Sequence, residues 1–205
     1  MNVIVDYGLG NLRSVLMKFE RLKLPAIVSA DPGDVLAAGK LVLPGVGSFD
    51  AGMANLRDRG LVEVLNKRVL DEGVPVLGIC LGMQLFARSS EEGRLPGLGW
   101  IDAQVRKITP PKEEQSIRVP HVGWNNLDIQ GDCHLFAGID SSLRYYFTHS
   151  YAVFCEDSAQ VLATTTHGET FASVVGKNNI LGTQFHPEKS HLHGLAMLKN
   201  FITLS

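Results

Sequence analysis

The chain has 205 residues, of which 45% are hydrophobic and 20% are charged. This mix is typical of a globular protein that buries a full core, and the length fits one domain, so we expect a single domain over residues 1–205. A net charge of -2 gives no basic footprint for nucleic acid or for an anionic membrane. The longest uncharged stretch, residues 73–87, contains Pro75 and is too short to span a membrane.

The N-terminus and the cysteines indicate whether the protein is exported and whether its thiols are oxidised. The opening residues MNVIVDYG lack a basic region and alternate like a strand, which argues against a signal peptide. Cys80, Cys133 and Cys155 are odd in number, widely spaced and without a CxxC pair. This spacing favours neither a disulfide framework nor a cysteine zinc site. We therefore expect a cytoplasmic protein with reduced thiols.

The first half of the chain alternates expected strands and helices. Residues 2–6 are expected to form a strand, and Asn11 is expected to cap the helix that follows. That helix is indicated by apolar residues at spacings of three and four, at positions 12, 15, 16, 19 and 22. Further strands are expected at 26–29, 40–43 and 74–79, with a helix at 61–70. This alternation predicts an α/β fold with a flavodoxin-like three-layer core and a mainly parallel sheet.

The second half of the chain is expected to contain mostly strands. The candidates are residues 100–108, 117–119, 145–154, 160–165, 171–176 and 180–185, joined by turns such as PPKEE at 110–114 and HGET at 167–170. Little helix separates them, so we expect antiparallel strands added to the edge or flank of the parallel sheet. A closing helix is expected from about residue 191 to 202.

The stretch GICLG at 78–82 holds a cysteine between two glycines. This is the G-x-nucleophile-x-G pattern, which presents a side chain on a sharp turn between a strand and a helix. Glycine suits both flanks because the turn brings backbone close to its neighbours. The alternative is that Cys80 is a small core hydrophobe, which is the role we assign to Cys133 and Cys155, since neither has glycine flanks.

A nucleophilic cysteine needs a base, and the base needs an orienting group. His186 ends a strand-like segment and precedes Pro187, which favours extended backbone. In extended backbone, side chains two residues apart lie on the same side, so His186 and Glu188 can face one site. The alternative is metal binding by His186, Glu188, His191 and His193. We disfavour it because His191 and His193, two apart on an expected helix, do not share a face.

Two glycine-containing loops follow expected strands near the N-terminus. PGVGSF at 44–49 would expose the backbone N–H groups that an oxyanion site needs, together with the N–H of Leu81. The loop DYGLGN at 6–11 is similar to a dinucleotide-binding loop. However, position 13, where the third glycine of that motif belongs, is Arg13, so we do not expect a nucleotide there.

Together these motifs resemble the class I glutamine amidotransferases, which release ammonia from glutamine with a Cys-His-Glu triad. The resemblance rests on GICLGMQ at 78–84, PGVGSF at 44–49 and HPE at 186–188. Within that family, the branch that serves histidine biosynthesis is resembled most. That narrower match rests on Met83 and on DYGLGNLRSV at 6–15, PHVGWN at 120–125, THSY at 148–151 and HPEKS at 186–190.

The resemblance implies a role for each matched residue. Cys80 would attack the side-chain amide of L-glutamine, His186 would pass the proton to the leaving ammonia, and Glu188 would orient the imidazole. The remaining positions would hold the oxyanion or bind the two ends of glutamine: the backbone at Val46, Gly47 and Leu81, then Gln84 and the backbone around His149, Ser150 and Tyr151. We expect no cofactor and no bound metal.

The resemblance also implies a partner. Members of this branch deliver ammonia through a tunnel to a (β/α)₈-barrel synthase, which converts PRFAR to imidazole glycerol phosphate and AICAR. Nothing in this chain resembles the barrel, so we expect a heterodimer. The docking face is expected to include Pro120, His121, Val122, Gly123, Trp124, Asn125 and Lys189. Trp124 would suit an interface anchor, although an ordinary core aromatic is the simpler interpretation.

Two other hypotheses remain open. The first keeps the glutaminase but changes the synthase that it serves, for example to one that makes anthranilate or pyridoxal phosphate. The second treats the chain as a catalytically silent binding module on a flavodoxin-like scaffold.

Overall fold

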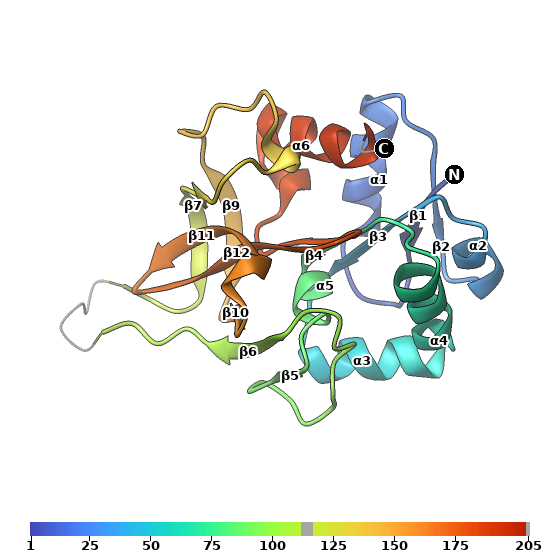
Figure 1. Cartoon of the computed structure of the whole chain (residues 1–205), viewed down its shortest axis with the longest axis horizontal. Helices are drawn as coiled ribbons and strands as arrows, with labels where there is room; N and C mark the ends of the chain where they lie inside the picture. Colours follow the sequence, from blue (N-terminus) through green and yellow to red (C-terminus); the bar gives the residue numbers. More distant parts are fainter. Residues whose placement is uncertain (112–116, 204–205) are drawn as a thin grey trace.

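A central parallel sheet separates two groups of helices in the structure, a computed structural model in which residues 1–111 and 117–203 are described (Figure 1). Five strands form this sheet in the order β2-β1-β3-β4-β13. They are β1 (Asn2–Val5), β2 (Ala26–Ser29), β3 (Lys40–Gly45), β4 (Val76–Cys80) and β13 (Ile180–Thr183). All neighbours along this order are parallel. The order is that of flavodoxin-like sheets, as the sequence predicts.

Each face of the parallel sheet has its own helices because the strand residues alternate between the faces. In β1, Val3 and Val5 pack into one core cluster and Ile4 into the other. The first cluster includes buried residues of α2 (Pro32–Leu36), α3 (Phe49–Asp58), α4 (Leu61–Asn66) and the π-helix η1 (Lys67–Asp71). The second includes those of α1 (Leu12–Arg21) and α6 (His191–Thr203). The core is therefore three-layered.

Antiparallel strands extend the sheet beyond β13. They are β12 (Glu169–Lys177), β10 (Tyr151–Cys155) and β6 (Ala103–Lys107), followed by β5 (Ser89–Ser90), which is parallel to β6. Two more strands branch from β12, namely β11 (Val161–His167) and β8 (Asp128–Ile129). A separate two-stranded sheet is formed by β7 (His121–Asn125) and β9 (Tyr145–His149). This arrangement confirms the predicted fold class.

Short helical segments complete the chain. They are α5 (Leu81–Gln84) and the 3₁₀ turns η2 (His134–Phe136), η3 (Ser158–Gln160) and η4 (Pro187–Lys189). The side chain of Asn11 accepts a hydrogen bond from the N–H of Ser14 at 3.2 Å, which confirms the predicted cap of α1.

Several predicted strands are placed differently in the structure. Residues 117–119 are not a strand; β7 begins instead at His121, immediately after Pro120, which has no N–H to donate to a ladder. The stretch 145–154 is broken at Ser150, where the chain leaves β9 in the small sheet and enters β10 in the large one. The last strand, β13, was expected among the antiparallel additions but is parallel to β4 in the centre of the core.

The helices also differ in part from expectation. The predicted helix at 61–70 is α4 continued by the π-helix η1, and α3 was not predicted at all. The HGET turn joins β11 to β12 in a hairpin, as expected, and Gly168 supplies its left-handed backbone at φ +79. Most of the PPKEE turn lies outside the described residues.

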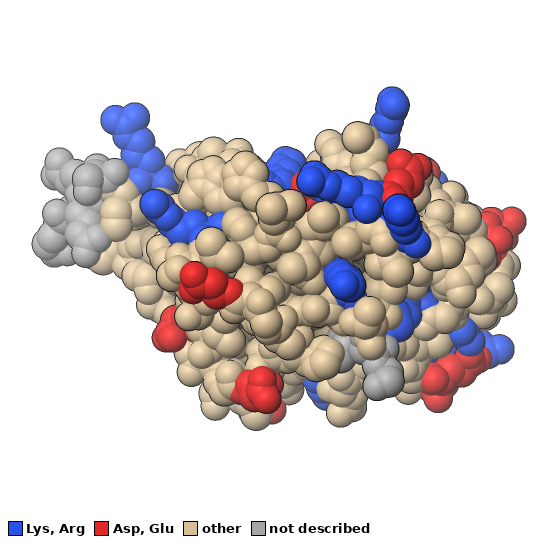
Figure 2. All heavy atoms as spheres, turned by 90° about the horizontal axis from the view of Figure 1, so that it is seen from above, with Lys and Arg blue, Asp and Glu red and all other residues tan. Residues whose placement is uncertain are grey.

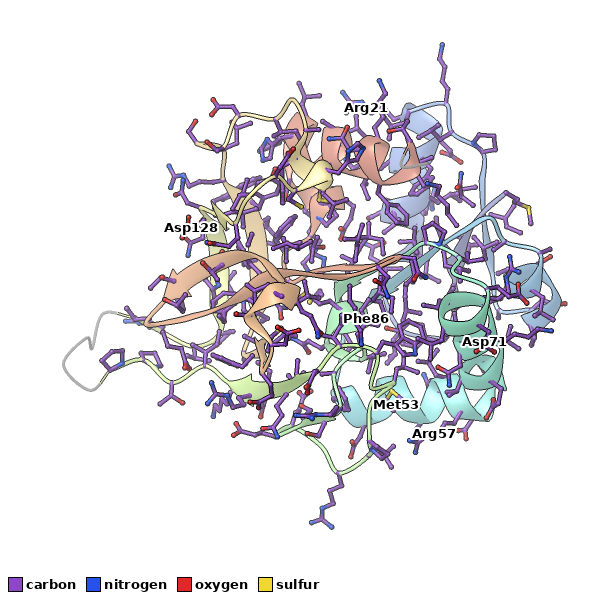
Figure 3. All side chains as sticks on the ribbon, in the orientation of Figure 1. Arg21, Met53, Arg57, Asp71, Phe86 and Asp128 are labelled. Atoms are coloured by element: carbon purple, nitrogen blue, oxygen red, sulfur yellow. The ribbon has the colours of Figure 1, made fainter. Side chains whose placement is uncertain are left out.

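The side chains of α3 show why that helix forms here. Met53 is buried and Figure 3 shows it and Phe86 directed into the layer between α3 and the sheet, whereas Arg57 points outward.

Over the face seen in Figure 2, separate lysine and arginine side chains stand among larger uncharged areas. Across residues 1–111 and 117–203, no helix is both long and apolar enough to cross a membrane.

Candidate active site

Cys80 occupies a sharp turn between β4 and α5, as its flanking glycines predict. It has a left-handed backbone at φ 55, which is rare for a residue other than glycine. A Cβ added at Gly82 would overlap the carbonyl oxygen of Leu43, and one at Gly78 would lie 2.7 Å from the N of Met83. The two glycines are therefore required by close backbone approach. This strained turn holds the sulfur at the carboxyl end of β4.

His186 and Glu188 lie next to the turn and form a buried pair. The Nδ1–H of His186 donates to Oε1 of Glu188 at 2.7 Å, and each side chain is 3% exposed. The backbone of His186 is fixed on both sides: its N–H donates to the carbonyl of Tyr146 at 2.9 Å, and its carbonyl accepts from the Ser190 hydroxyl at 2.7 Å. The structure thus pairs these two residues, but across the 3₁₀ turn η4 and not through the extended backbone that the sequence predicts.

Because Nδ1 of His186 bonds to Glu188, its Nε2 atom is the one that can interact with Cys80. Burial acts to lower the pKa of His186, but its interactions with the sulfur of Cys80 and with Glu188 prevail and raise it to about 9. The Nε2 atom has no hydrogen-bond partner of good geometry among the described residues. The sulfur of Cys80 is therefore close enough to the imidazole to raise its pKa.

A cavity of 210 Å³ opens beside the thiol. Its lining contains every residue that the sequence predicts for the oxyanion and for glutamine, together with Glu92 and Thr148: Val46, Gly47, Cys80, Leu81, Gln84, Glu92, Thr148, His149, Ser150 and Tyr151. His186 and Glu188 are not part of this lining. Four larger hollows, of 350 to 630 Å³, are lined by neither Cys80 nor His186, although Glu188 and Lys189 line the one of 440 Å³.

The side-chain amide of Gln84, a residue of the cavity wall, donates hydrogen bonds to two neighbouring residues. One N–H of Gln84 donates to the carbonyl of Tyr151 at 2.9 Å, and the other to Oε1 of Gln184 at 3.0 Å. Because both donors are used, the Oε1 of Gln84 remains as the group available to a molecule in the cavity.

A pair of buried histidines joins β7 to β9, the strand that ends in the cavity wall. His149 donates from Nδ1 to the carbonyl of Tyr151 at 2.8 Å, so its Nε2 accepts from Nδ1–H of His121 at 3.0 Å. Burial lowers the pKa of His121 to about 3 and that of His149 to about 4, and neighbouring histidines add to the effect in both. Both rings are therefore neutral near pH 7, which this chain of hydrogen bonds requires.

The expected docking face is only partly exposed. Val122 is 57% exposed and Trp124 39%, whereas His121 is buried and points inward. The ring of Trp124 stacks on that of His191 with centroids 4.7 Å apart, so Trp124 is not a core aromatic. Lys189 is exposed, and its Nζ lies 5.6 Å from the centre of the Tyr146 ring.

The four residues of the metal alternative do not converge on one point. His186 bonds to Glu188, while His193 Nε2 donates to the carbonyl of Arg144 at 2.6 Å. The expectation that His191 and His193 face apart is wrong, because His191 has φ 52 at the start of α6 and its ring lies 6.3 Å from that of His193. Within the described residues, no group of three or more His, Cys, Asp or Glu is arranged to hold a metal ion.

Three residues of the site were not predicted from the sequence, namely Thr148, which lines the cavity beside His149, and Glu92 and Gln184. Glu92 lines the cavity and accepts from the N–H of Phe49 at 2.8 Å, so it also holds the loop after PGVG. Gln184 is fully buried and donates to the sulfur of Cys80 at 3.7 Å. Gln184 lies two residues before His186, and this proximity in sequence was the available signal.

Comparisons with known proteins agree with this geometry. The sequence profile described as "Glutamine amidotransferase class-I" matches residues 3–204. The chain is 47% identical over 202 residues to "Imidazole glycerol phosphate synthase subunit HisH 2" of Methanococcus maripaludis, covering 98% of each chain. It is 48% identical to the HisH subunit of Syntrophotalea carbinolica, again covering 98% of both. The chain belongs to the class I glutamine amidotransferases and, within them, to the HisH family.

Solved structures show the same fold at low sequence identity. One is titled "Crystal structure of glutamine amidotransferase", with a TM-score of 0.73, 21% identity and coverage of 98% of this chain and 96% of that one. Another is "Structure of PurLQS from Thermotoga maritima", with a TM-score of 0.73, 17% identity and the same coverage. At these identities, the two structures show only that they share the fold of this chain.

Proposed function

We propose that this chain acts in the cytoplasm as the glutaminase subunit of an imidazole glycerol phosphate synthase. The observation that carries the proposal is the convergence of Cys80 and the His186–Glu188 pair, which are far apart in sequence, beside one cavity. Its place among glutaminase subunits is supported by the HisH relatives, which match over nearly their full length.

The geometry supports acyl transfer through Cys80. His186 Nε2 takes the thiol proton, and the sulfur attacks the side-chain carbonyl carbon of glutamine. Backbone N–H groups at Val46, Gly47 and Leu81 stabilise the oxyanion of the tetrahedral intermediate. As the intermediate collapses, His186 gives the proton to the departing nitrogen, which leaves as ammonia. Glu188 holds the ring orientation and stabilises the imidazolium.

The second half of the reaction regenerates the thiol. A water molecule, deprotonated by His186, attacks the γ-glutamyl thioester, and the proton returns to the leaving sulfur. Glutamate is then released. The scheme uses the side chains of this chain and water, and it invokes no cofactor.

The cavity also supplies groups for the other end of glutamine. The carboxylate of Glu92 and the Oε1 of Gln84 are acceptors suited to an α-ammonium group, because both residues line the same cavity. The backbone of His149, Ser150 and Tyr151 lies on the same wall and is suited to the α-carboxylate.

The ammonia would pass to a second subunit, a (β/α)₈-barrel synthase that converts PRFAR to imidazole glycerol phosphate and AICAR. A closed route between the subunits is needed because ammonia released into water is protonated and no longer nucleophilic. We place the docking face at Val122 and Trp124, with Lys189 at its border. An exposed aromatic and an aliphatic side chain in one strand suit the centre of such an interface.

The test is glutamate release by the chain alone, with the barrel synthase, and with the synthase and PRFAR. We expect the complex with PRFAR to be the most active, and Cys80→Ala to abolish the release. Cys133→Ala is the matched control, since Cys133 is a buried free thiol outside the cavity.

Two outcomes would overturn the proposal. Stimulation by an anthranilate or pyridoxal phosphate synthase, and not by the PRFAR enzyme, would reassign the partner. Absence of glutamate release with every synthase would indicate a silent binding module.

A further inference from the structure

Gln184 lies in the segment that joins β13 to His186, where the chain bends before the 3₁₀ turn η4. This segment brings the Gln184 side chain to the sulfur of Cys80, which His186 also approaches. It is anchored to β12, where the N–H of Gln184 donates to the carbonyl of Ser173 at 2.9 Å. The side chain is fully buried, so its amide must be satisfied inside the protein.

Both ends of the Gln184 amide bond to residues of the site. Its Nε2 donates to Sγ of Cys80 at 3.7 Å, within the longer reach of a sulfur acceptor, and its Oε1 accepts from Gln84 at 3.0 Å. The opposite orientation of the amide would place two N–H donors against each other at Gln84. The orientation is therefore fixed by the donor of Gln84, and this directs an N–H at the sulfur.

The same contact determines which atom Gln84 presents to the cavity. Gln84 gives one N–H to Tyr151 and the other to Gln184, so its carbonyl oxygen remains free. Gln184 itself is not part of the cavity lining. Any effect that it has on the reaction passes through Cys80 and Gln84.

We infer that Gln184 is a positioning residue that ties the nucleophile and the substrate-binding amide into one frame. Its N–H holds the sulfur in place and stabilises the negative charge that sulfur carries as a nucleophile. Its carbonyl holds Gln84 in the orientation that faces the cavity. These two effects can be separated, because glutamate at this position keeps an acceptor oxygen but has no N–H for the sulfur.

The experiment compares Gln184→Met, Gln184→Glu and Gln160→Met. The first removes both contacts and the second removes the donor to sulfur. Gln160 is a matched control because it is also a buried glutamine with two partners, donating to Asp157 and accepting from the N–H of Asp102, and it lies outside the cavity. The readouts are the rate of Cys80 alkylation by iodoacetamide, followed by intact mass, the melting temperature, and kcat and KM for glutamine in the complex.

We expect alkylation of Cys80 to slow by about tenfold in both Gln184 variants, because each loses one hydrogen bond to a charged acceptor. In Gln160→Met the alkylation rate should be unchanged. We expect KM to rise in Gln184→Met and to stay near the wild-type value in Gln184→Glu. Alkylation at the wild-type rate in Gln184→Met would overturn the inference, whatever its melting temperature. If Gln184→Glu does not fold, Gln184→Met decides alone.

The KM arm rests on the proposed function, whereas the alkylation arm needs only the thiol. If glutamine is not a substrate, wild-type protein shows no turnover and the alkylation order still tests the role of Gln184. The two failures are therefore distinguishable.

Discussion

The Nδ1 nitrogen of His186 lies 2.7 Å from the Oε1 oxygen of Glu188, and both side chains are almost fully buried. Because the Nδ1–H is held by the carboxylate, the Nε2 atom is the one that faces Cys80. A buried carboxylate in this position stabilises the protonated imidazole that forms when the ring accepts a proton from the thiol.

The titration of His186 should report this arrangement. Its pKa is raised from 6.5 to about 9, so the protonated ring stabilises the fold fully below pH 6.5, and this contribution is lost as the pH rises through 9. In Cys80→Ala the contribution of the sulfur disappears, and the midpoint should fall. NMR of the imidazole protons measures it, with the exposed His134 as the internal control. An unchanged midpoint in Cys80→Ala would contradict the contact between the ring and the sulfur.

The turn that carries Cys80 should not tolerate a side chain at Gly82. In Gly82→Ala the new Cβ overlaps the carbonyl oxygen of Leu43, so β3 and α5 must separate. We expect a loss of about 3 kcal/mol or more in unfolding free energy, measured by urea denaturation. Gly60→Ala is the control: Gly60 has φ +64 but an open surrounding, so it should cost about 1 kcal/mol. Equal costs would argue against the close approach.

Replacing Tyr7 by phenylalanine should stabilise the protein. Its hydroxyl is buried without a hydrogen-bond partner among the described residues, and burial, with Cys80 nearby, raises its pKa so that it stays protonated. Tyr7→Phe removes an unsatisfied polar group and should stabilise the protein by about 1 kcal/mol, visible as a higher melting temperature. The hydroxyl of Tyr145 is also unpartnered, and Tyr145→Phe should behave alike. A loss of stability in Tyr7→Phe would indicate a bound water or another acceptor.

The pair His121–His149 should make the fold sensitive to acid. The pKa of His121 is lowered from 6.5 to about 3, so its contribution to stability is fully present above pH 6.5 and is lost progressively as the pH falls toward 3. Between pH 7 and pH 5, His121→Phe should lose about 2 kcal/mol less unfolding free energy than the wild type. Urea denaturation at both values measures the difference. Parallel losses in the two proteins would show that His121 is not kept neutral by the fold.

The parts of the site that the sequence predicts are those determined by local chemistry. The glycines around Cys80 mark a turn wherever that turn lies. His186 and Glu188 are near enough in sequence to pair, although they do so across the 3₁₀ turn η4 and not in the extended backbone that was expected. The resemblance to a known family adds the residues of the cavity wall, which no local pattern connects to Cys80.

The parts that the sequence does not predict depend on contacts between distant segments. Gln184 acquires its role only because β13 lies beside β4, and the parallel position of β13 was not foreseen. Glu92 joins the cavity from an irregular stretch after α5. The apolar spacing of α3 at Phe49, Met53 and Leu56 was present in the sequence, but it begins immediately after the PGVG loop and was not separated from it.

The measurement that tests the central claim most directly is turnover of PRFAR by the complex, with glutamine or with ammonium salt as the nitrogen source. In Cys80→Ala the glutamine-dependent rate should vanish while the ammonium-dependent rate stays at the wild-type level, because only the ammonia source is lost. Loss of both rates together, or survival of the glutamine-dependent rate, would contradict the assignment of Cys80 as the nucleophile that supplies ammonia.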